Sequence, residues 1–207
     1  MVVNRKQRTL LLIAGTPGTG KTYTSNIIKD HFPQFFVLPL DLIKEHIYDE
    51  VGFDDVSEKR MVDDKAYERF YQVVELYMKR EAPLLVEYPF SYKQLSALKQ
   101  LVKSYCYKAV TVRLEADSQT LYQRAVKRDL KEQRHPGLLM NHYCRGDQIL
   151  DKSQIDGLPT YKTFKNRIQE RGYQEFSLGT LLTLNVNDFN KINYEVFLKR
   201  LEEKLTD

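Results

Sequence analysis

The sequence predicts an α/β fold in which a mostly parallel β-sheet is covered by helices on both faces. Short apolar runs alternate with longer amphipathic segments along the chain, which is the pattern of repeated strand–helix–strand units. The first apolar run, Thr9–Ala14, leads directly into a glycine-rich turn and then into a helical pattern. Strands that are joined by helical crossovers pair in parallel, so both faces of the sheet are expected to be buried.

The apolar runs indicate five strands, and the amphipathic segments indicate five main helices. The strands are expected at Thr9–Ala14, Phe35–Leu40, Pro83–Glu87, Ala109–Glu115 and Leu181–Val186. The helices are expected at Lys21–Phe32, Lys65–Glu81, Tyr92–Ser104, Ser118–Glu132 and Tyr194–Lys204. Pro39 lies in the second strand, and proline is tolerated mainly at a sheet edge. The second strand is therefore expected at an edge, which leaves a central place for the first.

Two stretches do not fit simple crossovers. Asp41–Asp64 is expected to form a short helix over Asp41–Val51 and then an acidic loop. Arg134–Arg171 is long, polar and irregular, and such a segment is commonly functional, disordered or built of small helices of its own. Since no linker or repeat divides the chain, residues 1–207 are expected to form one domain with an insert, or lid, at about 134–171.

The composition predicts a globular protein without a membrane-spanning segment. Apolar residues make up 42% of the 207 residues, which is enough for a sizeable core. The apolar run Leu10–Ala14 is too short for a membrane span or a signal peptide. The two cysteines, Cys106 and Cys144, lie far apart and suit a reducing compartment, so a cytoplasmic location is expected. The net charge of +4 suits anionic ligands but does not require nucleic acid.

The most specific motif is Gly15-Thr16-Pro17-Gly18-Thr19-Gly20-Lys21-Thr22, which matches the phosphate-loop pattern G-x-x-x-x-G-K-[ST]. Its glycines allow backbone N–H groups to turn around a phosphate, and the helix that follows presents its positive end to the same anion. Lys21 can reach the β- and γ-phosphates of a nucleotide, and the Thr22 hydroxyl can bind Mg²⁺. The alternative is a glycine-rich turn with a chance lysine, which the strand–loop–helix context disfavours.

Asp41 is the first candidate for a catalytic group. It follows the second strand, and ligands of open α/β sheets lie at the carboxyl ends of the strands. A carboxylate there could accept the proton of a substrate hydroxyl that attacks the γ-phosphate. Asp41 is also a suitable N-cap for a helix over Leu42–Val51, and both roles stay open.

Glu87 ends the apolar third strand, in the position of a Walker B acid that holds Mg²⁺ directly or through water. The alternative is an ordinary charge at a strand end that faces solvent.

Three arginines form the third candidate feature. Arg124 and Arg128 lie four residues apart and so share one face of a helix, and Arg134 follows. Together they could close over the γ-phosphate and stabilise its charge during transfer. The alternative is a solvated basic face, which is the favoured reading for Lys127 and Lys131.

The sequence resembles the P-loop small-molecule kinases of the nucleoside-monophosphate-kinase-like group. The resemblance rests on four features that occur in this order: the Gly15–Thr22 loop, Asp41, Glu87, and the arginines up to Arg134-His135-Pro136-Gly137. The nearest branch is the chloramphenicol phosphotransferase and zeta-toxin type. The resemblance covers Thr9–Gly137 and the fifth strand. It implies a three-layer P-loop NTPase fold with strand order 2-3-1-4-5 and a mobile lid that bears arginines. It also implies Mg-ATP as phosphoryl donor, a small-molecule hydroxyl as acceptor with Asp41 as base, and an adenine-contacting loop at Asn187.

Three other nucleotide-dependent functions are alternatives to a small-molecule kinase. Asn185–Asp188 has the spacing of the guanine-reading motif of GTPases but lacks its lysine. A regulatory ATPase module would need a partner protein and no acceptor. A polynucleotide kinase would use the basic run Arg124–Arg134 on a nucleic-acid backbone, which the modest net charge does not favour.

The nature of the acceptor is less well specified. The segment between the second and third strands is acidic, which would disfavour a phosphorylated acceptor and favour a neutral or cationic one such as a sugar, an aminoglycoside or another polyol. Its acidic residues are Asp54, Asp55, Glu58, Asp63 and Asp64. Arg145–Arg171 could cover the acceptor or form an oligomer contact, and both remain open.

Overall fold

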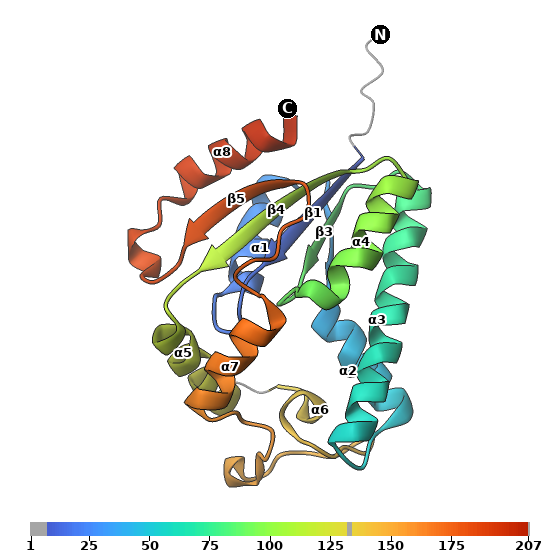
Figure 1. Ribbon diagram of the computed structural model, residues 1–207, viewed down its shortest axis with the longest axis vertical. Coiled ribbons are helices and arrows are strands. Elements are labelled where there is room, and N and C mark those ends of the chain that lie inside the picture. Colours follow the sequence, from blue (N-terminus) through green and yellow to red (C-terminus); the bar gives the residue numbers. More distant parts are fainter. Residues whose placement is uncertain (1–7, 132–133, 207) are drawn as a thin grey trace.

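The computed structural model describes residues 8–131 and 134–206, which contain a five-stranded parallel sheet in the order β2-β3-β1-β4-β5 (Figure 1). The strands are β1 (Thr9–Ala14), β2 (Phe36–Pro39), β3 (Leu84–Glu87), β4 (Lys108–Glu115) and β5 (Thr180–Asn185). The predicted fold class and strand order are thus confirmed. β2 is an edge strand, as Pro39 indicated, and β1 is central.

Helices cover both faces of this sheet (Figure 1). The longer helices are α1 (Lys21–His31), α2 (Leu40–Val51), α3 (Val56–Lys79), α4 (Tyr92–Ser104), α5 (Ser118–Lys131), α7 (Tyr161–Arg171) and α8 (Tyr194–Thr206). The short elements are α6 (Pro136–Leu139) and two 3-10 turns, η1 (Lys152–Gln154) and η2 (Phe189–Lys191). In the described ranges, no helix combines the length and the hydrophobicity that are needed to cross a membrane.

The pleat of β1 explains the layers. Leu12 shares a fully buried core cluster with Phe70 of α3, whereas its neighbour Ile13 shares the opposite cluster with Ile28 of α1. Successive side chains of a strand point to opposite faces, so a strand covered on both sides must be apolar throughout. The unbroken run Thr9–Ala14 is the result, and it fixes α3 and α4 on one face and α1 and α8 on the other.

The register of the strands brings distant parts of the sequence to one edge. Ile13 of β1 pairs with Glu87 of β3, and Glu87 pairs with Pro39 of β2. The residues that follow these strands therefore emerge side by side at the carboxyl edge of the sheet. In the lower part of Figure 1, α5, α6 and α7 lie beyond this edge.

The prediction of an acidic loop before Lys65 is wrong, because residues 56–64 form the beginning of α3. The helix begins at Val56 and not at Lys65. The Asp55 carboxylate accepts hydrogen bonds from the backbone N–H groups of Ser57 at 2.6 Å and Glu58 at 2.9 Å. An Asp N-cap followed by an acid in the first turn is a strong signal for a helix start, and it outweighs the scarcity of apolar residues.

Of the alternatives for the Arg134–Arg171 segment, the structure shows helices within it, and the last part forms α7. Thr160 caps the helix by accepting from the backbone N–H of Thr163, and Gly172 ends it in the left-handed conformation. Phe164 and Ile168 lie one turn apart and bury their side chains in the cluster that α5 shares. Two buried apolar residues in a polar helix give a weak periodic signal, so tertiary packing forms α7.

Replacement of Asp55 by Ala should lower the free energy of unfolding by about 1 kcal/mol, because two backbone N–H groups of α3 lose their acceptor. Urea denaturation followed by circular dichroism measures this change. The matched control is Asp54→Ala, since the Asp54 side chain makes no hydrogen bond or ion pair to the described residues. Equal losses for the two variants would contradict the capping role of Asp55.

Candidate active site

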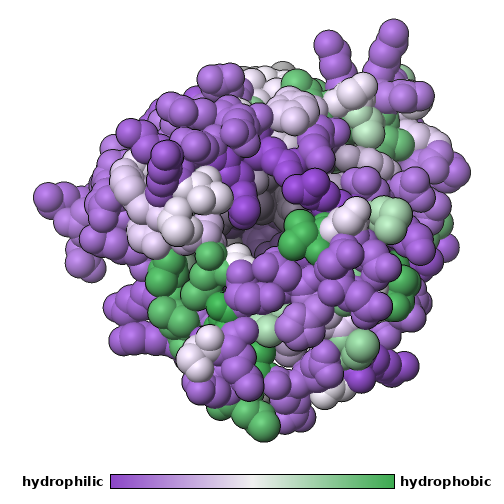
Figure 2. All heavy atoms as spheres, turned by 60° about the horizontal axis from the view of Figure 1, so that its bottom comes forward, coloured by the Kyte–Doolittle hydropathy of each residue, from purple (hydrophilic) through white to green (hydrophobic). Residues whose placement is uncertain are grey.

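A cleft of about 620 Å³ opens at the carboxyl edge of the sheet. Figure 2 looks into this face, where a hollow is surrounded by a mostly hydrophilic rim. Most of the site residues that the sequence predicted line it: Pro17, Gly18, Gly20, Lys21, Thr22, Asp41, Glu87, Arg124, Arg128 and Arg134. The other predicted residues of the phosphate loop, Gly15, Thr16 and Thr19, are buried beneath it. Asn187 lies outside the cleft lining.

The phosphate loop adopts a backbone that requires glycine. Gly18 has a φ of +92°, and a Cβ atom there would lie 2.4 Å from the carbonyl oxygen of Leu121. The Lys21 ammonium folds back over the loop and donates to the carbonyl oxygens of Gly15 at 3.0 Å and Thr16 at 3.3 Å. Since α1 begins at Lys21, the positive end of the helix dipole lies at the same place. The loop is thus built to receive an anion.

Burial, together with the nearby guanidinium of Arg128, lowers the pKa of Lys21 to about 8. The carboxylates of Asp41 and Glu87 act in the opposite direction, and Arg134 adds to the lowering. Lys21 therefore lies close to four of the predicted site residues, Asp41, Glu87, Arg128 and Arg134. A buried ammonium among guanidinium groups is unfavourable by itself, and a polyphosphate would supply the missing negative charge.

Glu87 is buried at the end of β3 and accepts a hydrogen bond from the Thr22 hydroxyl at 2.7 Å. Its second carboxylate oxygen, Oε2, is buried and has no hydrogen-bond partner among the described residues. A solvent-facing strand end, the alternative for Glu87, is therefore wrong. A cation beside this oxygen would relieve the cost of burying it. Among the described residues there is no group of three or more potential metal ligands. Two oxygen donors fit Mg²⁺, which keeps water and phosphate oxygens as its other ligands.

Asp41 lies in the first turn of α2, and it does not cap the helix. Pro39 is the N-cap, and no side chain accepts a capping hydrogen bond there. The helix begins at Leu40, earlier than the N-cap alternative required, so Asp41 is carried past the cap position and lines the cleft instead. Its Oδ2 atom lies 3.5 Å from Nη2 of Arg134, and its side chain remains 44% exposed. The capping alternative is thus wrong, and Asp41 faces the position of the phosphate loop.

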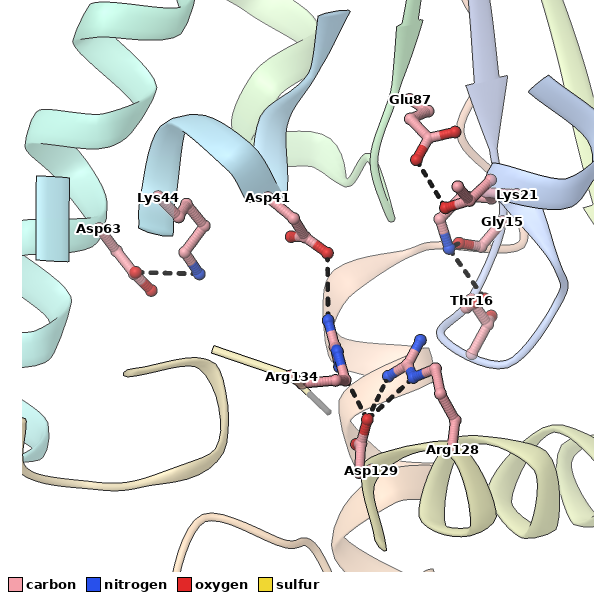
Figure 3. A network of polar contacts seen from close by, with 11 residues as sticks. Gly15, Thr16, Lys21, Asp41, Lys44, Asp63, Glu87, Arg128, Asp129 and Arg134 are labelled. Carbon is pink, nitrogen blue, oxygen red and sulfur yellow. Dashed lines mark hydrogen bonds and ion pairs between the residues drawn. The ribbon is translucent and has the colours of Figure 1, made fainter. Parts of the chain in front are cut away.

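Asp129 is a site residue that the sequence analysis missed. Figure 3 shows its carboxylate between Arg128 and Arg134. One oxygen, Oδ1, accepts from Nε of Arg128 at 2.8 Å and lies 2.8 Å from Nη2 of the same side chain. The same oxygen accepts from Nη1 of Arg134 at 2.7 Å. In the sequence Asp129 resembles any acid on a solvated helix face, and the only available signal was its position next to an arginine.

Arg124 lies apart from the other two arginines. Its guanidinium donates to the carbonyl oxygens of Val186 at 2.6 Å and Asn187 at 2.7 Å, and it stacks 4.3 Å from the ring centre of Phe189. The Asn187 side chain accepts from the backbone N–H of Asp117 at 3.0 Å. Arg124 and Asn187 are therefore neighbours at the loop that follows β5, where the family resemblance implied an adenine site.

The segment after α5 is fastened to α2 and α3. His135 accepts from the backbone N–H of Gly137 through Nδ1, and its Nε2 lies 3.2 Å from the Asp49 carboxylate of α2. Lys59 of α3 donates to the carbonyl oxygen of Met140 at 2.6 Å. The His-Pro-Gly part of the motif thus starts α6 and ties it to the neighbouring helices.

The far wall of the cleft comes from α7 and the residues on either side of it. This wall includes Leu158, Pro159, Phe164, Arg167, Ile168 and Tyr173. The sequence analysis left two roles open for Arg145–Arg171, and the structure places part of this segment over the cleft. Three tyrosines, Tyr88, Tyr122 and Tyr173, also line the cleft.

The acidic residues at the start of α3 do not line the cleft. Asp55 caps α3, and Asp63 pairs with the Lys44 ammonium at 2.9 Å. Their charges are therefore used within the helices. The inference of a neutral or cationic acceptor, which was drawn from these residues, loses its basis.

Comparisons with known proteins agree with this geometry. The sequence model of the zeta toxin family matches residues 2–143. No curated protein sequence matches the chain. A candidate kinase from Chloroflexus aurantiacus is similar over 95% of this chain and 97% of its own, with a TM-score of 0.69 and 21% identity. The gluconokinase from Sinorhizobium meliloti 1021 is similar over 96% of both chains, with a TM-score of 0.57 and 13% identity. A chain of the PezAT chromosomal toxin–antitoxin system of Streptococcus pneumoniae is similar over 97% of this chain and 87% of its own, with a TM-score of 0.52 and 14% identity.

At these identities the solved structures establish a shared fold and nothing finer. The family match is more informative, because it spans well over half of the chain and contains the phosphate loop, Asp41, Glu87 and all three arginines. It ends at residue 143, so α7 lies outside the matched part. The chain belongs to the zeta toxin family of P-loop small-molecule kinases.

Proposed function

We propose that the protein is a phosphotransferase that moves the γ-phosphate of Mg-ATP to a hydroxyl group of a small molecule. One observation carries this proposal: the phosphate loop, the hydrogen-bonded pair of Thr22 and Glu87, and Asp41 all share one cleft. A module that only bound nucleotide would not need a further carboxylate opposite the loop.

The donor side of the cleft holds the nucleotide. The loop amides and Lys21 bind the β- and γ-phosphates, and the Thr22 hydroxyl with Glu87 holds Mg²⁺. The ion neutralises charge on the β- and γ-phosphate oxygens when it is bound. Arg124 and Asn187 are assigned to the side of the nucleotide base, because both lie at the loop after β5.

Transfer forms one bond to the γ-phosphorus, breaks another, and releases one proton from the acceptor. The acceptor oxygen forms a bond to the γ-phosphorus as the bond from that phosphorus to the β–γ bridging oxygen breaks, and ADP leaves. Asp41 orients the acceptor hydroxyl and receives its proton. Arg128 and Arg134 stabilise the charge on the transferring phosphoryl group.

The substitution Asp41→Asn should lower phosphoryl transfer at least about 100-fold, because the acceptor hydroxyl loses its proton acceptor. Binding of Mg-ADP should not weaken. The assay is ADP release from Mg-ATP with separate pools of nucleosides, nucleotides, sugars, aminoglycosides and a 5′-hydroxyl oligonucleotide. Glu50→Gln is the control, since Glu50 is an exposed acid of α2 outside the cleft. Wild-type hydrolysis that no pool stimulates would contradict the kinase proposal and favour an ATPase module.

The substitution Glu87→Gln should raise the Mg²⁺ concentration for half-maximal turnover by about 10- to 100-fold, because a buried anionic oxygen beside Thr22 is lost. A titration of turnover with Mg²⁺ at saturating ATP measures this. The matched control is Glu115→Gln at the end of β4, where the carboxylate pairs with Arg113 outside the cleft. An unchanged Mg²⁺ requirement for Glu87→Gln would exclude the proposed role.

Binding of Mg-ADP should weaken as the pH rises above about 8, by up to about tenfold per pH unit. In the protein without nucleotide the pKa of Lys21 is about 8, so the lysine loses its charge as the pH rises above this value. Bound phosphate favours the protonated form. Calorimetric titrations on both sides of pH 8 measure the slope. Lys21→Arg should remove the slope, because a guanidinium stays protonated. Lys59→Gln should retain it, since Lys59 has a similarly lowered pKa of about 8 but lies outside the cleft.

A further inference from the structure

Arg134 bridges two carboxylates in the cleft. Its Nη1 atom donates to Oδ1 of Asp129, and its Nη2 atom faces Oδ2 of Asp41. Figure 3 shows the guanidinium between the two acids, on the side of the cleft that faces Lys21. One arginine thus connects the α5 side of the site with the candidate base on α2.

The two contacts differ in strength. The contact to Asp129 measures 2.7 Å, and the Asp129 side chain is only 14% exposed. The contact to Asp41 measures 3.5 Å, and the Asp41 side chain is 44% exposed. A short pair in a buried setting is harder to break than a long, solvated one. Asp129 is further fixed by Arg128, which contacts the same oxygen. Asp129 is therefore an anchor, and the contact to Asp41 is the one that can be exchanged.

The γ-phosphate is the natural competitor for this exchange. Arg134 and Arg128 line the same cleft as the phosphate loop, so their guanidinium groups share the space next to it. Both guanidinium groups also act to lower the pKa of Lys21. A terminal phosphate has a greater negative charge than a carboxylate and forms stronger hydrogen bonds with arginine. A nucleotide with a γ-phosphate would therefore draw Nη2 of Arg134 away from Asp41.

We propose that Arg134 is a two-position latch whose anchor is Asp129. In the free protein its outer nitrogen holds Asp41, and in the nucleotide complex it holds the γ-phosphate and leaves Asp41 free. Asp129 is a positioning residue in this arrangement, since it acts through Arg134. The consequence is an order of binding in which the nucleotide precedes the acceptor, because Asp41 can take the acceptor hydroxyl only after the latch has moved. This order rests on the proposed function, whereas the exchange itself is a binding property.

The test compares two nucleotides that differ by the γ-phosphate. Dissociation constants for the Mg²⁺ complexes of ADP and of the non-hydrolysable ATP analogue AMP-PNP are measured by calorimetry for the wild type and Asp41→Asn. Removal of the competing carboxylate should tighten AMP-PNP binding by about 3- to 10-fold, in the range of coupling between neighbouring charged groups, and leave ADP binding within about twofold. Glu50→Gln, which removes an exposed charge from the same helix, should change neither constant.

Two further backgrounds separate the latch from simple repulsion between Asp41 and phosphate. In Arg134→Gln and in Asp129→Asn, the selective gain on Asp41→Asn should shrink to less than about twofold, because the arginine is lost or no longer anchored. A gain that persists undiminished in Arg134→Gln would overturn the latch, as would the absence of any gain in the wild-type background. A gain that persists in Asp129→Asn would overturn the anchoring role of Asp129.

These measurements need no acceptor, so they can be separated from the test of the proposed function. Phosphoryl transfer with flat AMP-PNP constants would overturn the latch alone. The expected binding pattern without transfer to any pool would overturn the kinase proposal and leave the exchange standing.

Discussion

Concentrated positive charge at the carboxyl edge of the sheet is the constraint on which the site depends. Lys21, Arg128 and Arg134 are held within a cleft where burial already disfavours the lysine charge. Three carboxylates make this arrangement possible without a ligand. Asp129 takes two of the guanidinium groups, Asp41 takes the outer nitrogen of one, and Glu87 acts on the lysine through space. Each acid compensates the positive charge that lies next to it.

The parallel sheet is what makes this meeting of side chains possible. Lys21 lies 20 residues before Asp41, and Asp41 lies 46 residues before Glu87, yet each follows or ends a strand of the same sheet. The pairing of Ile13 and Pro39 with Glu87 sets the three strand ends at one level. β1 and β3 are buried on both faces, so a shift of either strand would disturb the packing of both hydrophobic layers. The precision of the site therefore comes from the hydrophobic layers and not from the polar contacts themselves.

The parts of the structure that could be predicted from sequence are those with a strong local signal. The phosphate loop, the apolar strands and the acid at the end of β3 each combine a pattern with a chemical reason for it. The resemblance to a kinase group added the strand order, which patterns alone leave open. Asp55 also gave a local signal, because it stands before the polar start of α3, but the lack of apolar residues there favoured a loop. The rest depends on tertiary contacts. The position of the Arg124 guanidinium depends on two carbonyl groups that lie more than sixty residues further along the chain. Asp129 becomes a site residue only when Arg134 folds back onto it, and α7 is stable only against α5.

The division of the cleft between two stretches of chain has a consequence for how such proteins diverge. The phosphate loop, Asp41 and Glu87 lie within 2–143, whereas the wall that contains Arg167 and Tyr173 belongs to the segment that follows. Substitutions in α7 would change the shape and charge of this wall without altering those residues. A lineage that keeps the first stretch can therefore acquire new acceptors by altering the second, and selection can act on the two almost independently.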